Sequence, residues 1–203
     1  MKLYGGSRSP FFRKARVVLE EKGIPYEIQR MVPVPKTPEL LALHPMGKIP
    51  ILRDGDVVVP DSSVICAYLE RAHPAPALYP EAAADLAAAL FLEEYSDTRM
   101  SEVIGGINFE TFVKPQILKQ EPDLARAAEL RSRLPEIYGY VESRLSADRE
   151  WLLPRFGIAD IAVGCQLQGL LFCGEQIDAA RWPRTAAYRQ AIEARPSFKT
   201  AIS

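Results

Sequence analysis

The sequence is poor in cysteine and histidine, which excludes two common ways of stabilising a small protein. Its 203 residues include three cysteines and two histidines, and it has no Cys-x-x-Cys pair. An odd number of cysteines argues against a disulfide framework, and so few scattered ligands argue against a metal site. Because Cys66, Cys165 and Cys173 stand among aliphatic and aromatic residues, we expect buried free thiols in a reducing compartment, the cytoplasm.

The sequence also lacks a long apolar run and an excess of charge of either sign. No segment approaches the roughly 20 apolar residues that span a membrane, and the first residues are too short an apolar stretch for a signal peptide. The formal net charge is −1, so no overall basic field favours nucleic acid. We therefore expect neither a membrane nor a nucleic-acid partner. A composition of 48% hydrophobic and 25% charged residues is typical of a globular protein with a sizeable core.

Residues 1–80 show alternating strand and helix signals. The expected elements are a strand starting at Leu3, an amphipathic helix over 10–22, a strand over 24–30, a short helix over 37–43, a hairpin of 49–52 and 57–59 around Asp54-Gly55, and a helix over 61–71. A strand-helix-strand connection favours a parallel pair, and the hairpin adds antiparallel strands. This half is therefore predicted to be α/β.

Residues 81–203 are richer in alanine and show only helical periodicity. We expect helices over 85–112 with a kink at Gly105-Gly106, over 123–145 despite Pro135, over 158–174, 185–194 and 196–201. The segment 158–174 is apolar on all sides, which is typical of a helix buried all round. The second half is predicted to be all-α.

Short polar motifs stand at two of the predicted helix starts. Ser9 precedes Pro10, which suits a first helical turn, and the serine hydroxyl and the helix N-terminus both favour an anion such as a thiolate. Asp61 and Ser62 begin another helix, where free N–H groups bind a carboxylate and Asp61 can pair with an ammonium group. Each residue is also an ordinary N-cap, so the motifs alone leave a purely structural role open.

Together with Lys48-Ile49-Pro50-Ile51-Leu52, these motifs resemble the glutathione site of the cytosolic glutathione transferase family. The resemblance covers essentially the whole chain, and Ser9-Pro10-Phe11 is similar to the first helix of serine-type enzymes of tau-like, omega-like or related bacterial classes. It implies a thioredoxin-like domain over 1–78 and an all-helical domain over 85–203. One departure is Gly157-Ile158-Ala159-Asp160, because the family usually has Ser or Thr in place of this glycine.

The resemblance implies that glutathione is a co-substrate and that no cofactor is needed. Ile49, before a cis Pro50, would pair through its backbone with the cysteinyl residue, as an added strand does. The residues implied to bind the remainder of glutathione are Asp61 and Ser62 for its γ-glutamyl group, and Lys36 and Lys48 for its glycyl carboxylate and backbone.

The resemblance also assigns the reacting groups. Ser9 would stabilise the thiolate, with Ser7 and Tyr4 as alternatives. A second, hydrophobic and electrophilic substrate would bind in an apolar pocket between the halves, which we expect to be lined by Phe11, Met100, Val103, Ile104 and Ile107. An apolar stripe at this spacing is also what a helix buried in the core would show.

The expected function is therefore attack of the glutathione thiolate on an apolar electrophile, as in detoxification. The alternatives are a non-catalytic protein of the same fold that binds a protein partner, as stringent-starvation-type proteins do, and a glutathione-dependent isomerase or dehalogenase. A thiol-disulfide reductase of omega type would need a cysteine at Ser9. The family implies a homodimer, for which Leu86, Leu90 and Phe91 form a candidate contact face.

Overall fold

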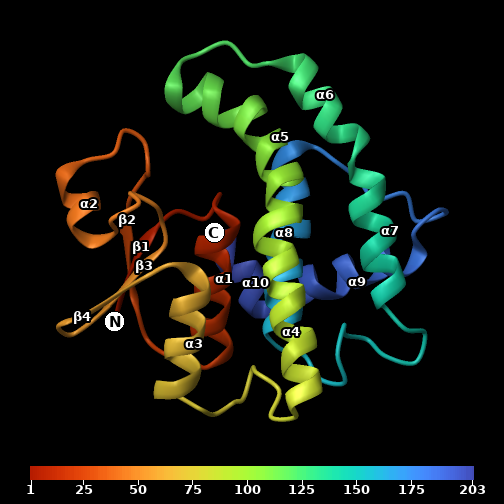
Figure 1. The fold of residues 1–203 in the computed structure, drawn as a ribbon, viewed down its shortest axis with the longest axis horizontal. Coiled ribbons are helices and arrows are strands. Elements are labelled where there is room, and N and C mark those ends of the chain that lie inside the picture. Colours follow the sequence, from red (N-terminus) through yellow and green to blue (C-terminus); the bar gives the residue numbers. More distant parts are fainter.

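In a computed structural model that describes residues 1–203, a four-stranded sheet and its helices form one part of the molecule and helices form the other (Figure 1). The strand order is β2-β1-β3-β4, with β1 and β2 parallel and the other neighbours antiparallel. The elements of this part are β1 (Lys2–Gly5), α1 (Pro10–Glu21), β2 (Glu27–Arg30), α2 (Pro38–Leu43), β3 (Ile51–Asp54), β4 (Val57–Pro60) and α3 (Ser62–Ala72). The expected thioredoxin-like order is confirmed.

The rest of the chain is helical, also as expected. One continuous helical stretch consists of α4 (Ala83–Tyr95), the π-helical η1 (Ser96–Gly105), α5 (Gly106–Asn108) and the π-helical η2 (Phe109–Leu118). It is followed by α6 (Leu124–Ser132), α7 (Leu134–Arg144), α8 (Ile158–Cys173), α9 (Pro183–Ala194) and α10 (Pro196–Ala201). None of these helices combines the length and the apolar character that crossing a bilayer requires.

The glycine pair in the first long helical stretch lies at a close helix–helix contact. Gly105 and Gly106 keep helical backbone angles, so the pair does not interrupt the helix. A Cβ atom on Gly106 would stand 2.7 Å from Cδ1 of Leu130 on α6. The glycine therefore allows two helices to approach closely, and it lies where the π-helical η1 passes into α5 within one continuous helical stretch.

The segment 123–145 is two helices rather than one. It breaks at Arg133, and Pro135 occupies the first turn of α7. A proline ring clashes with the carbonyl one turn earlier in a continuous helix, but fits a first turn, where its missing N–H is not needed. The local conflict at Pro135 is resolved by starting a new helix.

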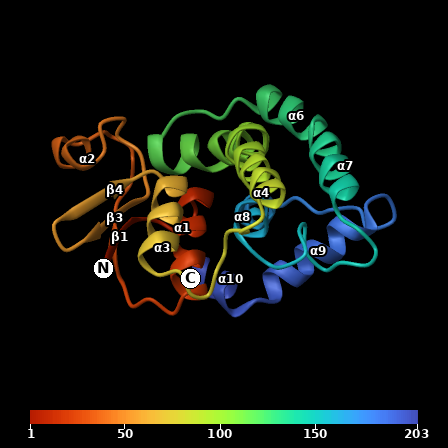
Figure 2. The ribbon, with the colours of Figure 1, turned by 60° about the horizontal axis from the view of Figure 1, so that its bottom comes forward.

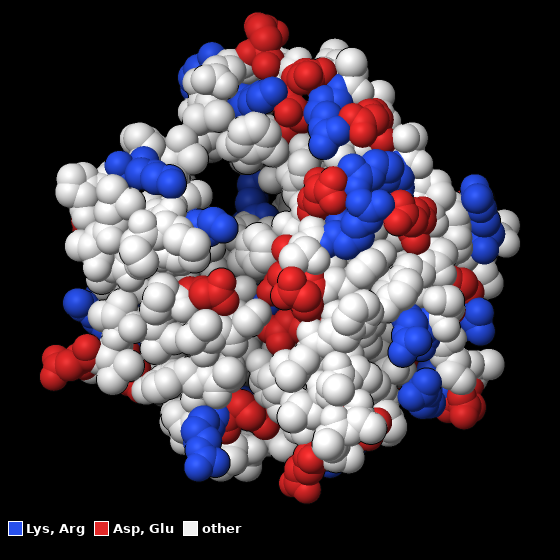
Figure 3. All heavy atoms as spheres, viewed as in Figure 1, with Lys and Arg blue, Asp and Glu red and all other residues white.

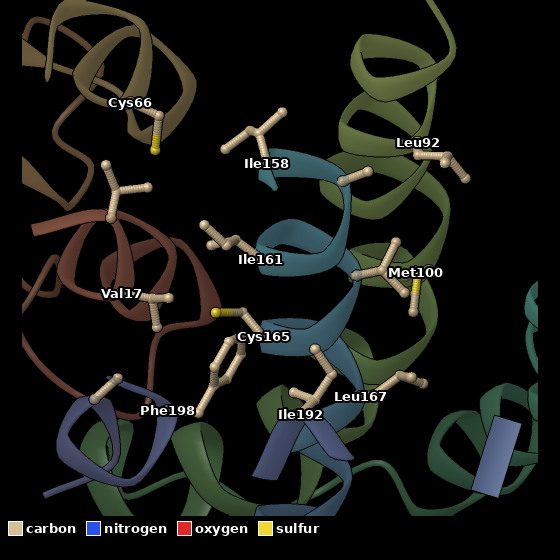
Figure 4. Packing of buried hydrophobic residues seen from close by; sticks show 14 of the residues in the cluster. Val17, Cys66, Leu92, Met100, Ile158, Ile161, Cys165, Leu167, Ile192 and Phe198 are labelled. Carbon is tan, nitrogen blue, oxygen red and sulfur yellow. The ribbon is translucent and has the colours of Figure 1, made fainter. Parts of the chain in front are cut away.

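The core lies where α1 meets α8 and α10. Figure 4 shows Val17, Cys165 and Phe198 directed from these three helices toward one apolar interior, and all three are at most 1% exposed. Helix α8 is buried along nearly its whole length, as its apolar composition predicts. Cys66 is buried as well, whereas Cys173 is only partly buried, and all three cysteines are free thiols.

Gly157, at the start of α8, meets the segment that joins the two parts. The N–H of Ile158 donates to the Leu78 carbonyl at 2.9 Å, and a Cβ atom on Gly157 would stand 2.5 Å from the same oxygen. The Asp160 carboxylate caps the helix start by accepting from the N–H groups of Gly157 and Leu152 at 3.1 and 3.0 Å. Burial raises the pKa of the Asp160 carboxyl to about 6, although these hydrogen bonds oppose the rise. The glycine is thus required by a close approach.

We predict that Gly157→Ala lowers the free energy of unfolding by about 1–3 kcal/mol, because the added methyl group must push the Leu78 carbonyl away. In thermal unfolding this corresponds to roughly 2–4 °C per kcal/mol for a chain of this size. Gly6→Ala is the matched control, since a Cβ atom there meets nothing within 4 Å. Equal melting temperatures for the two variants would contradict the explanation.

Candidate functional site

The pairing of the strands brings the predicted motifs to one edge of the sheet. Tyr4 of β1 stands opposite Ile51 of β3, and Ile51 stands opposite Pro60 of β4. Strands β1 and β4 end at this edge, and β3 begins there. Three segments therefore leave the sheet side by side, namely 6–9, 47–50 and 61–63.

Ser9 is the N-cap of α1, as its position before Pro10 predicts. Its Oγ accepts a hydrogen bond from the Phe12 N–H at 3.3 Å, and its own O–H donates to no protein atom. Ser7 likewise has a hydroxyl without a protein partner, and it stays an alternative. Tyr4 is 7% exposed and packs with Leu40 and Ile51, so it belongs to the core.

Ile49 presents a free section of backbone at this edge. The Ile49–Pro50 bond is cis, and neither the N–H nor the C=O of Ile49 forms a backbone hydrogen bond. Lys36 lies across Gly47, because a Cβ atom on that glycine would stand 2.8 Å from Cδ of Lys36. The structure therefore brings Lys36 next to Lys48 and Ile49, and both lysines are exposed.

Asp61 caps α3 from an unusual backbone conformation, with φ 75° and ψ 137°. Its Oδ1 accepts from the N–H groups of Ser63 and Val64 at 2.9 and 3.4 Å, which leaves Oδ2 without a protein partner. Ser62 follows in the first turn, and it is 3% exposed. A non-glycine residue at such an angle costs about 1–3 kcal/mol and is characteristic of ligand-binding sites.

A buried ion cluster, which no sequence motif predicted, lies directly behind Asp61. Lys14 Nζ donates to Ser63 Oγ at 2.8 Å, to Glu93 Oε1 at 3.0 Å and to Asp97 Oδ2. Burial by itself lowers the pKa of Lys14, but the charges of its neighbours, with that of Asp97 the largest, and the hydrogen bond to Asp97 together outweigh burial. The net shift is therefore upward and the amine stays charged. The cluster joins α1, α3 and the α4–η1 helix. Its only signal in the sequence was a run of cations on a helix that we expected to be amphipathic.

Arg13 is a second buried cation of α1, and it has no carboxylate partner. It donates to the carbonyls of Ser7 at 2.7 Å, Arg8 at 3.1 Å and Cys165 at 2.6 Å. Burial lowers the pKa of Arg13 to about 10. Because it holds two consecutive carbonyls just before Ser9, it orients the loop that leads into α1.

The expected electrophile pocket is largely wrong. Its four residues from the long helix are at most 2% exposed and belong to the main core, namely Met100, Val103, Ile104 and Ile107. Their elements, η1 and α5, both pack against α8, and Figure 4 shows Met100 at this contact. Phe11 is only half-buried. The surface is hollowed instead between the two parts, where Figure 3 shows Lys or Arg atoms at the rim and in the depth of the opening.

A separate cavity of 280 Å³ lies between 77–82 and 153–160. It is lined by residues such as Tyr79 and Phe156, and by none of the predicted site residues. The candidate site is therefore the edge of the sheet that faces the opening between the two parts.

Comparison with known proteins finds one family along most of the chain. Residues 3–77 match the family model "Glutathione S-transferase, N-terminal domain", and residues 124–191 match "Glutathione S-transferase, C-terminal domain". Glutathione S-transferase 3 of Zea mays is 31% identical over 214 residues, which cover 100% of this chain and 93% of the maize protein.

Two further similarities bear on function. A stringent starvation protein A homolog of Haemophilus ducreyi is 26% identical over 202 residues, covering 100% of this chain and 89% of that protein. The crystal structure of a glutathione S-transferase from Rhodospirillum rubrum F11 matches with a TM-score of 0.92 and 27% identity, covering 100% of this chain and 91% of that one. Glutathione S-transferases and a stringent starvation protein A homolog are thus both similar to this chain along its whole length.

We predict that the backbone at Asp61 stores strain that glycine would release. Asp61→Gly loses a cap at a cost of a few tenths of a kcal/mol but adopts the positive φ freely, so it should be at least as stable as the parent. Asp61→Ala keeps the strain and loses the cap, and it should be less stable by about 1 kcal/mol. Chemical denaturation of both variants measures this. An alanine variant more stable than the glycine variant would contradict stored strain.

Proposed function

This chain belongs to the glutathione S-transferase family, and we propose that it transfers glutathione to an apolar electrophile after activating the thiol as a thiolate. The observation that carries the proposal is the meeting of three segments at one sheet edge, which presents the Ser9 hydroxyl, the free backbone of Ile49 and the start of α3 together. We place this reaction in the cytoplasm and assign it no cofactor.

The free groups at this edge match the functional groups of glutathione. The Ile49 N–H and C=O can pair with the cysteinyl residue in the manner of an added strand. Oδ2 of Asp61 can accept from the γ-glutamyl ammonium, and Ser62 with the N–H groups at the start of α3 can bind the adjacent carboxylate. Lys36 and Lys48 would bind the glycyl carboxylate at the other end.

Ser9 would act on the sulfur. Its O–H donates to no protein atom and is free to donate to a thiolate, which the N-terminal end of α1 also favours. A hydrogen bond to the charged form lowers the thiol pKa, and each pKa unit corresponds to about 1.4 kcal/mol. The thiol proton leaves to solvent, the sulfur forms a bond to the electrophilic carbon, and the leaving group departs with its electron pair. Orientation of the two reactants supplies the rest of the acceleration.

The experiment that tests this role is the pH–rate profile of Ser9→Ala with a generic aromatic electrophile. If Ser9 stabilises the thiolate, its removal in Ser9→Ala raises the pKa of the bound thiol. Turnover of the variant at neutral pH then falls roughly tenfold or more and is regained at higher pH. Glutathione affinity, measured by calorimetry, should stay close to that of the parent.

Ser7→Ala is the matched control for Ser9→Ala. If Ser9 only caps α1, its removal costs about 1 kcal/mol of stability and leaves the pH profile where it was. Superimposed profiles for the parent and Ser9→Ala, with a shifted profile for Ser7→Ala, would transfer the role to Ser7.

A second candidate is a partner-binding protein without catalysis, which the full-length similarity to a stringent starvation protein A homolog supports. It differs from the first in needing no glutathione. A folded parent protein that binds no glutathione in calorimetry would favour this candidate.

A glutathione-dependent isomerase or dehalogenase would bind glutathione, and the isomerase would differ from the transferase in leaving it unconsumed at the end of the reaction.

We further propose a homodimer formed through the start of α3 and the exposed side of α4. Val64, Leu90 and Phe91 are 53%, 46% and 58% exposed, which is unusual for apolar side chains on neighbouring helices. The two helices lie close together here, because Lys14 joins Ser63 to Glu93. Leu86, also expected on this face, is half-buried.

Sedimentation velocity at micromolar concentration should show a dimer, and Phe91→Glu should convert it to a folded monomer by placing a charge in the apolar contact. Leu124→Glu is the control, since Leu124 is 66% exposed on α6, outside this face. A monomeric parent, or a Phe91→Glu variant that remains dimeric, would contradict the proposed contact.

A further inference from the structure

Arg8 reaches from the loop before Ser9 into the helical part of the molecule. Its Cζ lies 3.4 Å from the centroid of the Phe112 ring and 4.8 Å from that of Phe172. Its Nη2 donates to Oδ1 of Asn108 at 3.1 Å. These partners come from η2, α8 and α5 and are all uncharged. The planar cation is therefore held between two aromatic side chains on the helical wall, next in sequence to the residue proposed to hold the sulfur.

The charge of Arg8 is not neutralised by the protein. Its hydrogen bonds end on the Asn108 amide and the Phe172 carbonyl, its Nε is buried without a partner, and its Nη1 forms no hydrogen bond with the protein. Burial lowers the pKa of Arg8, as expected for a cation with no anionic neighbour. Cations that are partly removed from water are normally paired, so this arrangement calls for an external anion.

The cations at the start of α1 differ in their partners. Lys14 is neutralised by Glu93 and Asp97 on the side where α1, α3 and α4 meet. Arg13 donates hydrogen bonds only to carbonyl oxygens, including that of Arg8 itself. The uncompensated positive charge is therefore concentrated on one side, at the opening between the two parts of the molecule. A cleft with charge of one sign attracts ligands of the opposite sign.

We propose that Arg8 binds an anionic group, such as a carboxylate, carried by the otherwise apolar second substrate, and that this protein therefore prefers electrophiles that bear such a group. This inference rests on the proposed transferase function. Glutathione's own carboxylates would have other partners, at the start of α3 and at Lys36 and Lys48. The guanidinium offers a planar set of donors that matches a carboxylate, and its place beside Ser9 would bring the electrophilic carbon to the sulfur.

The anionic group takes no part in the bond changes. The thiolate forms the carbon–sulfur bond, the bond between that carbon and its leaving group breaks, and the leaving group takes the electron pair. Arg8 orients the substrate by binding a group that does not react. In this way binding energy is used to orient the reacting carbon. Phe112 and Phe172 would stack the guanidinium and fix its plane.

The test compares a chlorodinitrobenzoate with its primary amide, each rate being divided by that of the uncatalysed reaction with glutathione. We expect the parent to favour the benzoate in kcat/KM. The ratio of benzoate to amide should fall roughly tenfold or more in Arg8→Gln, because a charge-assisted contact is lost, and less in Arg8→Lys, which keeps the charge. Arg71→Gln is the control, since Arg71 lies in the last turn of α3, away from Asp61. An unchanged ratio in Arg8→Gln would overturn the inference.

A binding measurement keeps the two proposals separate. Calorimetry with the S-conjugates of the benzoate and of the amide requires no turnover. The anion site is supported if the parent binds the benzoate conjugate more tightly, and if this preference is lost in Arg8→Gln and retained in part in Arg8→Lys. This holds even if no electrophile is turned over, a result that would contradict only the transferase proposal. Equal affinities for the two conjugates, or loss of glutathione binding itself in a folded Arg8→Gln, would overturn the assignment of Arg8 to the second substrate.

Discussion

Burial of helix α1 on both of its sides is the constraint on which the rest of the structure depends. One side packs on the sheet and α3, and the other packs on α8 and α10 (Figure 2). Its residues from Phe12 to Leu19 are all buried, including three cations. Since a buried cation needs acceptors, Lys14 requires Glu93 and Asp97 on the helical side, and Arg13 requires the Cys165 carbonyl. These bonds determine how the two parts of the molecule meet.

The same helix sets the position of the site. Its N-terminus lies where the two parts meet, so a hydroxyl at the N-cap faces both the sheet edge and the helical wall. Asp61 stands at the same edge and holds a strained backbone angle, which the ion cluster behind it supports through Ser63. The strained backbone of Asp61 lowers stability but places a carboxylate at the site, and such strain is common at binding sites.

Buried charges in this protein fall into two kinds with different meanings. The Lys14 cluster is complete within the protein, because its cation meets two carboxylates and a hydroxyl, and it holds elements together. Arg8 and Arg13 meet only neutral groups, and they act on the loop that leads to Ser9: Arg8 precedes Ser9, and Arg13 holds the carbonyls of Ser7 and Arg8. A cation at the edge of a cleft that has no carboxylate partner can attract an anionic ligand. A cation that is already neutralised inside a closed cluster cannot.

The sequence by itself determined the features that depend on neighbours a few residues apart. The caps at Ser9 and Asp61, the hairpin at Asp54-Gly55 and the buried α8 all follow from local hydrogen bonds, turn chemistry and periodicity. From these the order of elements, the family resemblance and most of the candidate glutathione contacts could be predicted. The break before Pro135 is equally local, and there proline chemistry outweighed the helical period.

Only the tertiary structure decided which side of a helix faces solvent and which atoms meet across the chain. Periodicity could not distinguish core from pocket at Met100, because a stripe of apolar residues has the same spacing in both cases. Likewise, the charges of Arg13 and Lys14 indicated an exposed face of the helix, but in the structure a second layer of helices covers that face. From the sequence, Gly157 was expected to be a weak helix cap. The structure shows instead that a side chain there would collide with the Leu78 carbonyl. Such contacts join residues far apart in sequence, so no local pattern records them.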